Sequence, residues 1–550
     1  MKKLLVMVLL LAVLVSGVLL ASEIRRGGIV NITPMKQGVL IMNFNPYSPN
    51  ALEVAFGCFY ESLIYYNQMT GRIMPWLAKE YVWSDDLKSI TFVLRDDVKW
   101  NDGIPFTIAD VLFTMELAKN NVALDVSGIW AQGLVDVVAK SSDSITFTFD
   151  RVNTTVIERF SDFFIVPKHI WSNVADPLTW AGNVNPVGTG AFIYEQGSFT
   201  EQSFRVVRNP NYWQMGVDGK PLPYIDGIQY ISTTNVQVPF QLARGEYDWA
   251  GYFVANIDEV YVKANPEHHK YWLPEGNMVF LNLNNGKEPF DNYNLRLAVA
   301  YGIDQEEITR IMASGAVPSS IAGVKSAYLH LAEEALEKYD VEYDPDYSQY
   351  LIEREGYTLN RRGIYEKDGR ALSMNLYVPT GWTDWIAGGE EIVRQLREIG
   401  IEAILTQAAW PSPYKDMMFN GNYEMLFGIS QTGTNPHFQF DTWTHSRHWA
   451  PVGETAGNEW GMRYKNPIID EALDAYTKTP DPDEQDKYIS IVIEQFLKDM
   501  PSVPLFFNPV WFQYNTSRFV GWPSPENPYA LPRPNSMHKM PILLSIHLRN

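Results

Sequence analysis

Residues 374–429 read MNLYVPTGWTDWIAGGEEIVRQLREIGIEAILTQAAWPSPYKDMMFNGNYEMLFGI, and patterns typical of strands and of helices alternate along them. Strands are predicted at residues 374–378, 401–406 and 423–429, and helices at residues 390–399 and 414–419. Alternating strands and helices predict a parallel sheet in an α/β fold. Because open sheets of this kind bind ligands beyond the carboxyl ends of their strands, the stretch also indicates where a site should lie.

Three loops follow the predicted strands and are expected at one mouth of the sheet: residues 380–389, 407–413 and 430–440. They carry three tryptophans, and the third loop, SQTGTNPHFQF, is rich in amides and hydroxyls. The only side chain in these loops that is formally charged at neutral pH is Asp384. Neutral hydrogen-bonding groups beside flat indole faces suit a sugar, which has an apolar ring face and a girdle of hydroxyls.

Two other interpretations of these loops stay open. A tryptophan taken at random is more often a packing residue than a ligand platform, so each indole could belong to the core. A site for an amino acid or a peptide should offer a carboxylate to the amine and a base to the acid. Asp384 alone provides little for that purpose.

An earlier segment follows a strand, turn and helix pattern. Residues 90–95 alternate apolar and polar side chains, and Asn101-Asp102-Gly103 supplies turn residues. Thr107 and Asp110 have the spacing of a capping box at the start of a helix. A second helix start is predicted at Asp304.

The composition excludes several classes of protein. The chain has 550 residues, 46% of them hydrophobic and 20% charged, which is the balance of a globular protein with several domains. A formal charge of −20 argues against nucleic acid as a partner. The single cysteine, Cys58, cannot form an internal disulfide. No nucleotide-binding, metal-binding or nucleophile motif stands out, so no cofactor, metal ion or catalytic residue is predicted.

The first 22 residues have the layout of a secretory signal peptide. A basic start, Met1-Lys2-Lys3, precedes an uncharged apolar run over residues 4–20 and small residues at Ala21 and Ser22. A retained membrane anchor is the competing interpretation, because 17 residues approach the minimum that spans a bilayer. With no cysteine near the cleavage region, a lipid anchor is not expected. The mature chain is predicted to be extracytoplasmic, in the periplasm.

The sequence resembles the family 5 extracellular solute-binding proteins of ABC transporters. The strand, turn and helix segment ITFVLRDDVKWNDGIPFTIADVLFT, residues 90–114, carries the resemblance most strongly. Further matches follow in the order of the family, namely FNPY (44–47), YESLIYY (60–66), PWLAKEYVWS (75–84), PVGTGAF (186–192), RNPNYW (208–213), NLRLAVAYGIDQEEI (294–308), YDPDYSQYLIEREGY (343–357) and REIGIEA (397–403). Together they extend over nearly the whole mature chain.

The resemblance implies a type II periplasmic-binding-protein fold of cluster C, with two lobes and an extra domain on the N-terminal lobe. The implied domains are the signal peptide (1–22), a discontinuous core of lobe I (23–50, 184–277 and 508–550), the extra domain (51–183) and lobe II (278–507). The chain should cross between the lobes near residues 276–283 and 504–508. Solute should be trapped as the lobes swing about this hinge. The protein is expected to be a monomer that delivers the solute to a membrane permease powered by an ATPase.

One departure from the family bears on the ligand. Peptide-binding members have an acidic segment after the strand that corresponds to residues 423–429, whereas residues 431–436 of this chain read QTGTNP. This favours the branch that accepts short β-linked sugars resembling cellobiose, mannobiose or xylobiose. We expect stacking by Trp382, Trp385 and Trp410, hydrogen bonding to sugar hydroxyls by Gln431, Thr432 and Asn435, and a contact from lobe I by Asn45.

Three rival functions stay open. An oligopeptide receptor of the same family would bind peptides in place of sugars. A secreted glycoside hydrolase would release its oligosaccharide shortened, whereas a binding protein releases it whole. A tethered adhesion protein would keep residues 1–22. The oligosaccharide receptor, which is not an enzyme, is the prediction that the loops favour.

Overall fold

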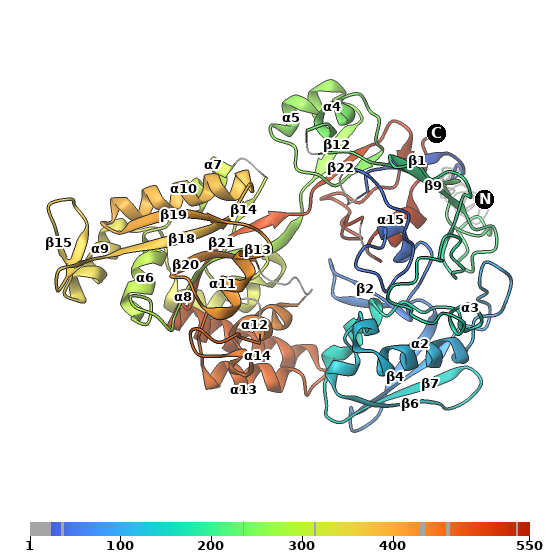
Figure 1. Cartoon of the computed structure of the whole chain (residues 1–550), viewed down its shortest axis with the longest axis horizontal. Coiled ribbons are helices and arrows are strands. Elements are labelled where there is room, and N and C mark those ends of the chain that lie inside the picture. The colour runs from blue at the N-terminus through green and yellow to red at the C-terminus, as the bar shows by residue number, and fades with distance from the viewer. Residues whose placement is uncertain are drawn as a thin grey trace, which may run out of the picture.

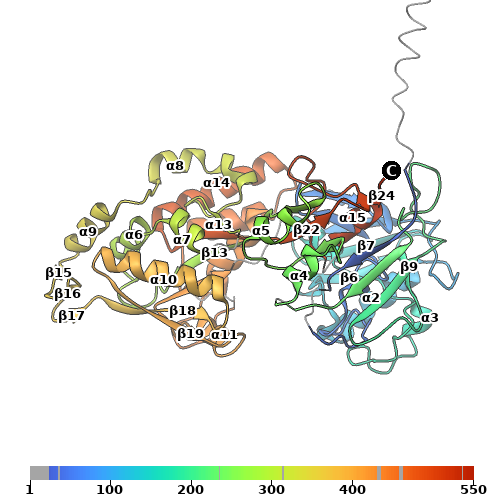
Figure 2. The same ribbon diagram turned by 90° about the horizontal axis from the view of Figure 1, so that it is seen from above.

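The computed structural model describes residues 24–34, 38–234, 236–312, 315–429, 435–457, 462–534 and 537–550. Within them the chain forms two bodies beside each other (Figures 1 and 2), each with its own hydrophobic core. We call lobe I the body whose core draws on residues 30–249 and 512–546, and lobe II the body whose core draws on residues 278–507. A small third cluster, residues 238–261, adjoins lobe I.

The main sheet of lobe I mixes parallel and antiparallel strands. Its order is β12 (His269–Trp272), β22 (Phe512–Asn515), β11 (Trp249–Ala250), β1 (Ile29–Ile32), β10 (Gly227–Ile231), β9 (Ser203–Arg208) and β8 (Phe192–Tyr194). β1 pairs in parallel with β10, in register from Ile29 opposite Gly227 to Ile32 opposite Tyr230. Strand β22 comes from the end of the chain, so the two ends of the sequence meet in this sheet.

The expected extra domain contains a second, antiparallel sheet. Its order is β4 (Ala78–Trp83), β5 (Ser89–Leu94), β7 (Ser144–Phe149) and β6 (Leu134–Ala139). β5 and helix α2 (Ile108–Asn120) confirm the predicted strand, turn and helix, and the Thr107 N–H donates to the Asp110 carboxylate at 2.9 Å. Residues of this domain belong to the same hydrophobic cluster as the main sheet, so lobe I has one continuous core.

Lobe II is built on a sheet with the order β14 (Val317–Pro318), β21 (Ser502–Pro509), β13 (Glu275–Leu283), β20 (Met425–Ile429), β18 (Ser373–Pro379) and β19 (Glu402–Ala408). β18 pairs in parallel with both β19 and β20, which confirms the predicted parallel arrangement. The α-helices in the described part of lobe II are α6 (Tyr293–Tyr301), α7 (Gln305–Met312), α8 (Glu333–Tyr339), α9 (Pro345–Arg354), α10 (Thr383–Glu398), α11 (Tyr414–Asn420), α12 (Pro436–Thr444), α13 (Pro467–Tyr476) and α14 (Pro482–Asp499).

Smaller elements complete the described chain. Lobe I also holds the hairpin of β2 (Ile64–Asn67) with β3 (Arg72–Pro75) and the antiparallel pair of β23 (Phe519–Val520) with β24 (His547–Leu548). Its helices besides α2 include η4 (Thr154–Ser161), α3 (Lys168–Trp171), α4 (Val238–Ala243), α5 (Ile257–Val260) and α15 (Lys539–Ser545). The outer end of lobe II carries β15 (Thr358–Leu359), β16 (Tyr365–Lys367) and β17 (Arg370–Ala371).

Two strands carry the chain between the lobes. β13 and β21 pair antiparallel from Glu275 opposite Pro509 to Asn282 opposite Ser502, and they include both predicted crossings. A Cβ added at Gly276 would lie 2.3 Å from the Asn508 carbonyl oxygen, so only glycine permits this close approach. The two-lobed type II fold with a two-segment hinge is therefore confirmed.

Candidate binding site

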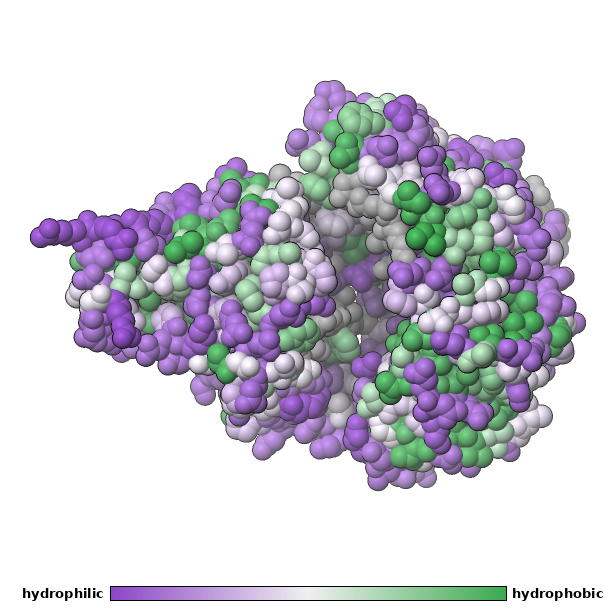
Figure 3. Space-filling view, in the orientation of Figure 1, coloured by the Kyte–Doolittle hydropathy of each residue, from purple (hydrophilic) through white to green (hydrophobic). Residues whose placement is uncertain are grey.

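The parallel strands of lobe II point their carboxyl ends toward lobe I. In Figure 1, β18 runs from the end of lobe II that carries β15 toward the other lobe, with β19 beside it. The loops after β18 and β19 therefore open on the space between the lobes. The space-filling view shows a hollow between the two lobes (Figure 3).

The three predicted tryptophans meet at these carboxyl ends. The ring of Trp382 lies between the other two, with centroid distances of 4.8 Å to Trp385 and 5.4 Å to Trp410. Trp410 is 37% exposed and Trp382 is partly exposed. Lys415 places its ammonium 5.1 Å from the centroid of Trp410. Trp382 and Trp410 thus present indole surface, whereas Trp385, the third member of the tryptophan cluster, does not.

Trp385 is the buried member of the tryptophan cluster. It is 2% exposed, packs on Phe427 at 5.5 Å between ring centroids, and donates from Nε1 to Oδ1 of Asn508 at 3.4 Å. Asn508 belongs to hinge strand β21, so the tryptophan cluster is anchored against the hinge. In this conformation Trp385 supports Trp382 and offers no free ring face for a ligand.

The helix after β18 begins earlier than predicted. Helix α10 begins at Thr383, whereas the predicted helix began at residue 390 and the predicted loop included Gly388 and Gly389. A Cβ at Gly388 would lie 3.0 Å from the Met312 sulfur, and one at Gly389 would lie 2.7 Å from Leu405 Cδ1. The glycines therefore permit close packing of α10 against α7 and β19, and this packing outweighs their poor helix propensity.

The predicted polar contacts have different outcomes. Asn435 caps α12, because its Oδ1 accepts from the Phe438 N–H at 3.1 Å, and its Nδ2 donates to Oε1 of Glu158 in lobe I at 2.6 Å. It thus lies between the lobes, with both ends of its amide engaged. Gln431 and Thr432 lie outside the described residues.

Asn45 is not brought to the tryptophan cluster. It is 1% exposed, and its Nδ2 donates to the carbonyl oxygens of Pro177 and Trp180 at 2.7 and 3.1 Å. Its Oδ1 accepts from the Tyr47 N–H at 2.9 Å. The side chain therefore ties two segments of lobe I together, residues 45–47 and 177–180, and the structure gives no support to a ligand contact.

A cavity of about 1120 Å³ separates the lobes on the side away from the hinge, and it does not include the three tryptophans. Lobe I contributes residues from 66 to 162 together with His538, and lobe II contributes residues from 435 to 478. Unlike the predicted loops, this cavity is rich in charge. Its charged residues are Lys88, Asp150, Arg151, Glu158, Arg159, Asp162, Asp441, Arg447, Asp474 and Lys478.

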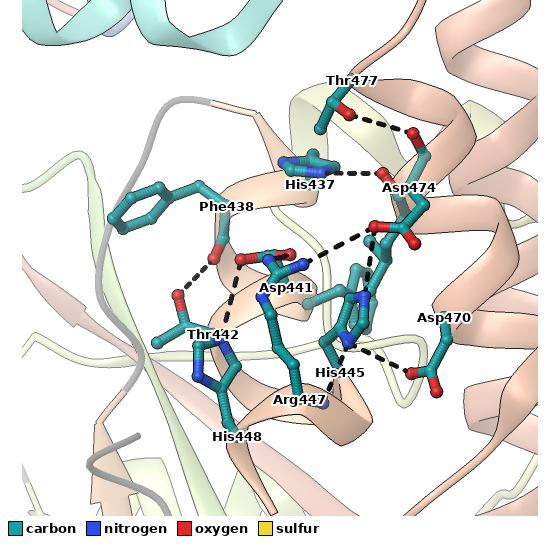
Figure 4. Close-up of polar contacts among 12 residues, drawn as sticks. His437, Phe438, Asp441, Thr442, His445, Arg447, His448, Asp470, Asp474 and Thr477 are labelled. Carbon is teal, nitrogen blue, oxygen red and sulfur yellow. Dashed lines mark hydrogen bonds and ion pairs between the residues drawn. The ribbon is translucent and has the colours of Figure 1, made fainter. Parts of the chain in front are cut away.

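Many charges on the lobe II wall of this cavity compensate one another (Figure 4). Arg447 pairs with Asp441 and lies 3.7 Å from Asp474, and His445 lies 3.4 Å from both Asp470 and Asp474. Burial opposes ionisation of Asp441, but the His448 ring 3.9 Å away, together with nearby His437 and Arg447, keeps its pKa below the usual range. These carboxylates are thus engaged within lobe II.

Glu158 is the carboxylate that reaches across the cavity. Burial raises its pKa to about 7, although Arg159 and the hydrogen bonds from Asn435 and Tyr66 act in the opposite direction. Glu158 and Asn435 are 277 positions apart, so no local pattern could have predicted their contact. Only the capping position of Asn435 before a helix was recognisable in the sequence.

Two further features are absent from the described part of the chain. No group of three or more His, Cys, Asp or Glu side chains there has the geometry to hold a metal ion. No helix in those residues combines the length and the apolar character that crossing a membrane requires.

Comparison with known proteins places the chain in a family. Residues 72–451 match the bacterial extracellular solute-binding proteins, family 5 Middle, which is more than half of the chain. The nickel-binding periplasmic protein of Escherichia coli K12 is 26% identical over 419 residues, covering 74% of this chain and 75% of the relative. The glutathione-binding protein GsiB of Salmonella paratyphi A is 24% identical over 480 residues, covering 82% and 84%.

Solved structures agree with this placement. A periplasmic oligopeptide-binding protein of an oligopeptide ABC transporter from Thermotoga maritima superposes with a TM-score of 0.83 at 25% identity, covering 95% of this chain and 99% of that one. The mannohexaose-bound structure of that protein superposes with a TM-score of 0.75 at 24% identity, covering 96% and 99%. The chain belongs to the family 5 bacterial extracellular solute-binding proteins and is the substrate-binding protein of an ABC transporter.

Proposed function

We propose that this protein captures short oligosaccharides, β-linked and resembling cellobiose or mannobiose, and delivers them to a membrane permease. The observation that carries the proposal is the tryptophan cluster at the carboxyl ends of β18 and β19. Trp410 and Trp382 keep exposed indole surface there, and Trp385 packs on Trp382 and donates a hydrogen bond to Asn508 of hinge strand β21. Indole faces of this kind bind the apolar face of a pyranose ring.

The Thermotoga maritima structures add support. One of them holds mannohexaose, so a protein of this fold with 24% identity accommodates a sugar chain. We expect closure on a ligand to change the angle between the lobes.

Function then follows from a shift between open and closed states. A ligand that touches both lobes only when they are closed stabilises the closed form by its extra contacts. A thousandfold preference for that form requires about 4 kcal/mol, which a few stacked rings and paired hydroxyls supply.

A second candidate function is the capture of peptides. The charged cavity between the lobes favours it, because acidic and basic side chains can pair with the termini of a peptide. The pairing of Asp441 and Asp474 with basic neighbours within lobe II reduces what this wall offers to a peptide amine. We therefore place the sugar first and the peptide second.

A ligand panel distinguishes the two functions. Melting temperatures are measured with mannohexaose, mannobiose, cellobiose and xylobiose, and with di-, tri- and pentapeptides. A ligand at 100 times its Kd stabilises the folded protein by about 2.7 kcal/mol. We expect shifts with the sugars; shifts with peptides alone would overturn the proposal. Recovery of the bound sugar at its original length separates a receptor from a glycoside hydrolase.

We also propose that residues 1–22 are removed on export, which makes the mature protein extracytoplasmic and free of a lipid anchor. The basic start and the apolar run carry this proposal. Mass spectrometry of the protein purified from its native cell measures the new N-terminus. A mature chain that begins at Met1 would support a tethered protein.

A further inference from the structure

The two lobes touch at a second place, on the side of the charged cavity away from the hinge (Figure 1). Helix η4 of lobe I meets the end of α13 in lobe II, where the Thr154 N–H donates to the Thr477 carbonyl at 2.9 Å. The Thr154 hydroxyl lies 3.2 Å from the same carbonyl and 3.1 Å from that of Thr479. Nearby, Asn435 donates to Glu158 at 2.6 Å.

The chemistry of helix ends explains why these groups meet. The first N–H groups of a helix and its last carbonyls lack partners within the helix. Asn153 caps η4 by accepting from the Thr155 N–H at 3.2 Å, whereas the Thr154 N–H is satisfied by the other lobe. Thr477 is the C-cap residue of α13, so its carbonyl lies at the negative end of that helix. The contact thus joins complementary helix ends.

The contact is well packed yet small. Thr154 is 6% exposed and lies beside the buried Val156 and Ile157, so its hydrogen bonds are shielded from water. The lobes nevertheless have separate hydrophobic cores, and the described bonds across this contact are polar. When the lobes swing about β13 and β21, the few polar bonds of this contact can break without exposing either hydrophobic core. The contact is therefore suited to form and separate reversibly.

We propose that Thr154, Glu158, Asn435 and the carbonyls of Thr477 and Thr479 form a clasp that holds the lobes closed opposite the hinge and slows the escape of ligand. With β13 and β21 on one side and the clasp on the other, the space between the lobes is bounded at two ends. The clasp residues act by fixing the position of the lobes. This role does not depend on whether the ligand is a sugar or a peptide.

Distances between labels on the two lobes test the clasp. Cys58 is the only cysteine and is fully buried, so cysteines introduced as Asp136→Cys on β6 and Glu471→Cys on α13, both exposed positions, take spin labels selectively. Distance distributions are recorded without ligand for the labelled parent, for Thr154→Val with Glu158→Ala, and for Glu116→Ala. Glu116 is exposed on α2 of the same lobe and serves as the matched control.

We expect a short-distance population in the parent and in Glu116→Ala, and a shift toward longer distances in the double variant. Glu158→Gln keeps an acceptor for Asn435 and should retain the short distance. Unchanged distances in a double variant that melts normally would overturn the proposal, as would a parent with no short-distance population. Should the double variant fail to fold, Thr154→Val alone gives the same comparison.

Ligand affinity provides a second readout. An apparent Kd rises as the closed population falls, so loss of the clasp should weaken binding of mannohexaose by about tenfold, mainly through faster release. This arm rests on the proposed sugar function, whereas the distance measurement does not. Absence of mannohexaose binding in the parent therefore counts against the sugar and leaves the clasp to be judged by the distances.

Discussion

Trp382 rests edge-on against Trp385, with ring centroids 4.8 Å apart and an interplanar angle of 74°. Trp385 is 2% exposed, so it forms the floor that supports the partly exposed Trp382. We expect Trp385→Ala to destabilise lobe II by about 3 to 5 kcal/mol through the cavity it leaves. Trp385→Phe should cost less because it keeps a ring.

Urea denaturation followed by fluorescence and circular dichroism measures this cost. The lobes have separate cores, so the transition of lobe II should move while that of lobe I stays in place. A Trp385→Ala protein with the stability of the parent would contradict the buried position of the indole.

The partly exposed tryptophans should matter for binding more than for folding. Trp382→Ala and Trp410→Ala should each weaken binding of mannohexaose by about 1 to 3 kcal/mol. Trp449 is a matched control, since it is 37% exposed like Trp410 but lies outside the tryptophan cluster. Isothermal titration calorimetry compares the variants. Equal affinities for Trp410→Ala and Trp449→Ala would remove Trp410 from the site.

Glu61 is a buried anchor in lobe I. Its carboxylate accepts from Trp76 Nε1 at 2.7 Å, from the Tyr212 hydroxyl at 2.7 Å and from Trp213 Nε1 at 3.1 Å, and burial raises its pKa. Glu61→Leu would leave these donors unpaired, so we expect lobe I to lose about 3 to 5 kcal/mol.

The control for this change is Glu61→Gln, which keeps one acceptor oxygen and should cost less. Denaturation should show the lobe I transition moving in the order parent, Glu61→Gln, Glu61→Leu. Equal stability of lobe I in Glu61→Gln and Glu61→Leu would show that hydrogen bonding to this side chain does not determine how much the side chain stabilises the lobe.

The stability of the protein should depend on pH through Glu158. Its pKa is about 7 in the folded protein, because burial outweighs the opposing effect of Arg159, against an ordinary value of 4.5. Between these values the folded state holds a proton that the unfolded state releases, so stability falls as pH rises from about 4.5 to 7. The groups that face Glu158 are Tyr66, Arg159, Tyr328, Asn435 and Tyr476.

Glu158→Gln removes this titration. Unfolding free energies are measured from pH 4 to 8. The unfolding free energy of the variant should rise relative to that of the parent between pH 4.5 and 7, and the difference should stay constant above pH 7. Parallel curves for the two proteins would mean that Glu158 titrates normally in the folded state.

Local patterns in the sequence predicted much of the fold. The alternation of apolar residues located β5, β18, β19 and β20, and the spacing of Thr107 and Asp110 located the start of α2. These features depend on neighbours within a few residues, which the sequence states directly. The position of Trp382, Trp385 and Trp410 at one sheet edge also followed, because parallel strands bring their carboxyl ends together.

Only the tertiary structure decided which of the three tryptophans are exposed and which one is buried. α10 begins at Thr383 and packs its Gly388-Gly389 face on Met312 and Leu405, so Trp385 points into the core while Trp382 remains partly exposed. Burial depends on which distant element covers a side chain, and residue type does not reveal it. The same reason explains Asn45, whose amide is engaged by backbone more than 130 positions away.

By itself the sequence determined the α/β class, the resemblance to solute-binding proteins and the neutral, aromatic character of the loops after the strands of lobe II. Only the tertiary structure decided that a charged cavity also lies between the lobes, and that Thr154 and Glu158 of lobe I meet Thr477 and Asn435 of lobe II. Hydrophobic periodicity fixes each element through contacts with near neighbours. Contacts between lobes join residues about 300 positions apart, and their pairing exists only once both cores have folded.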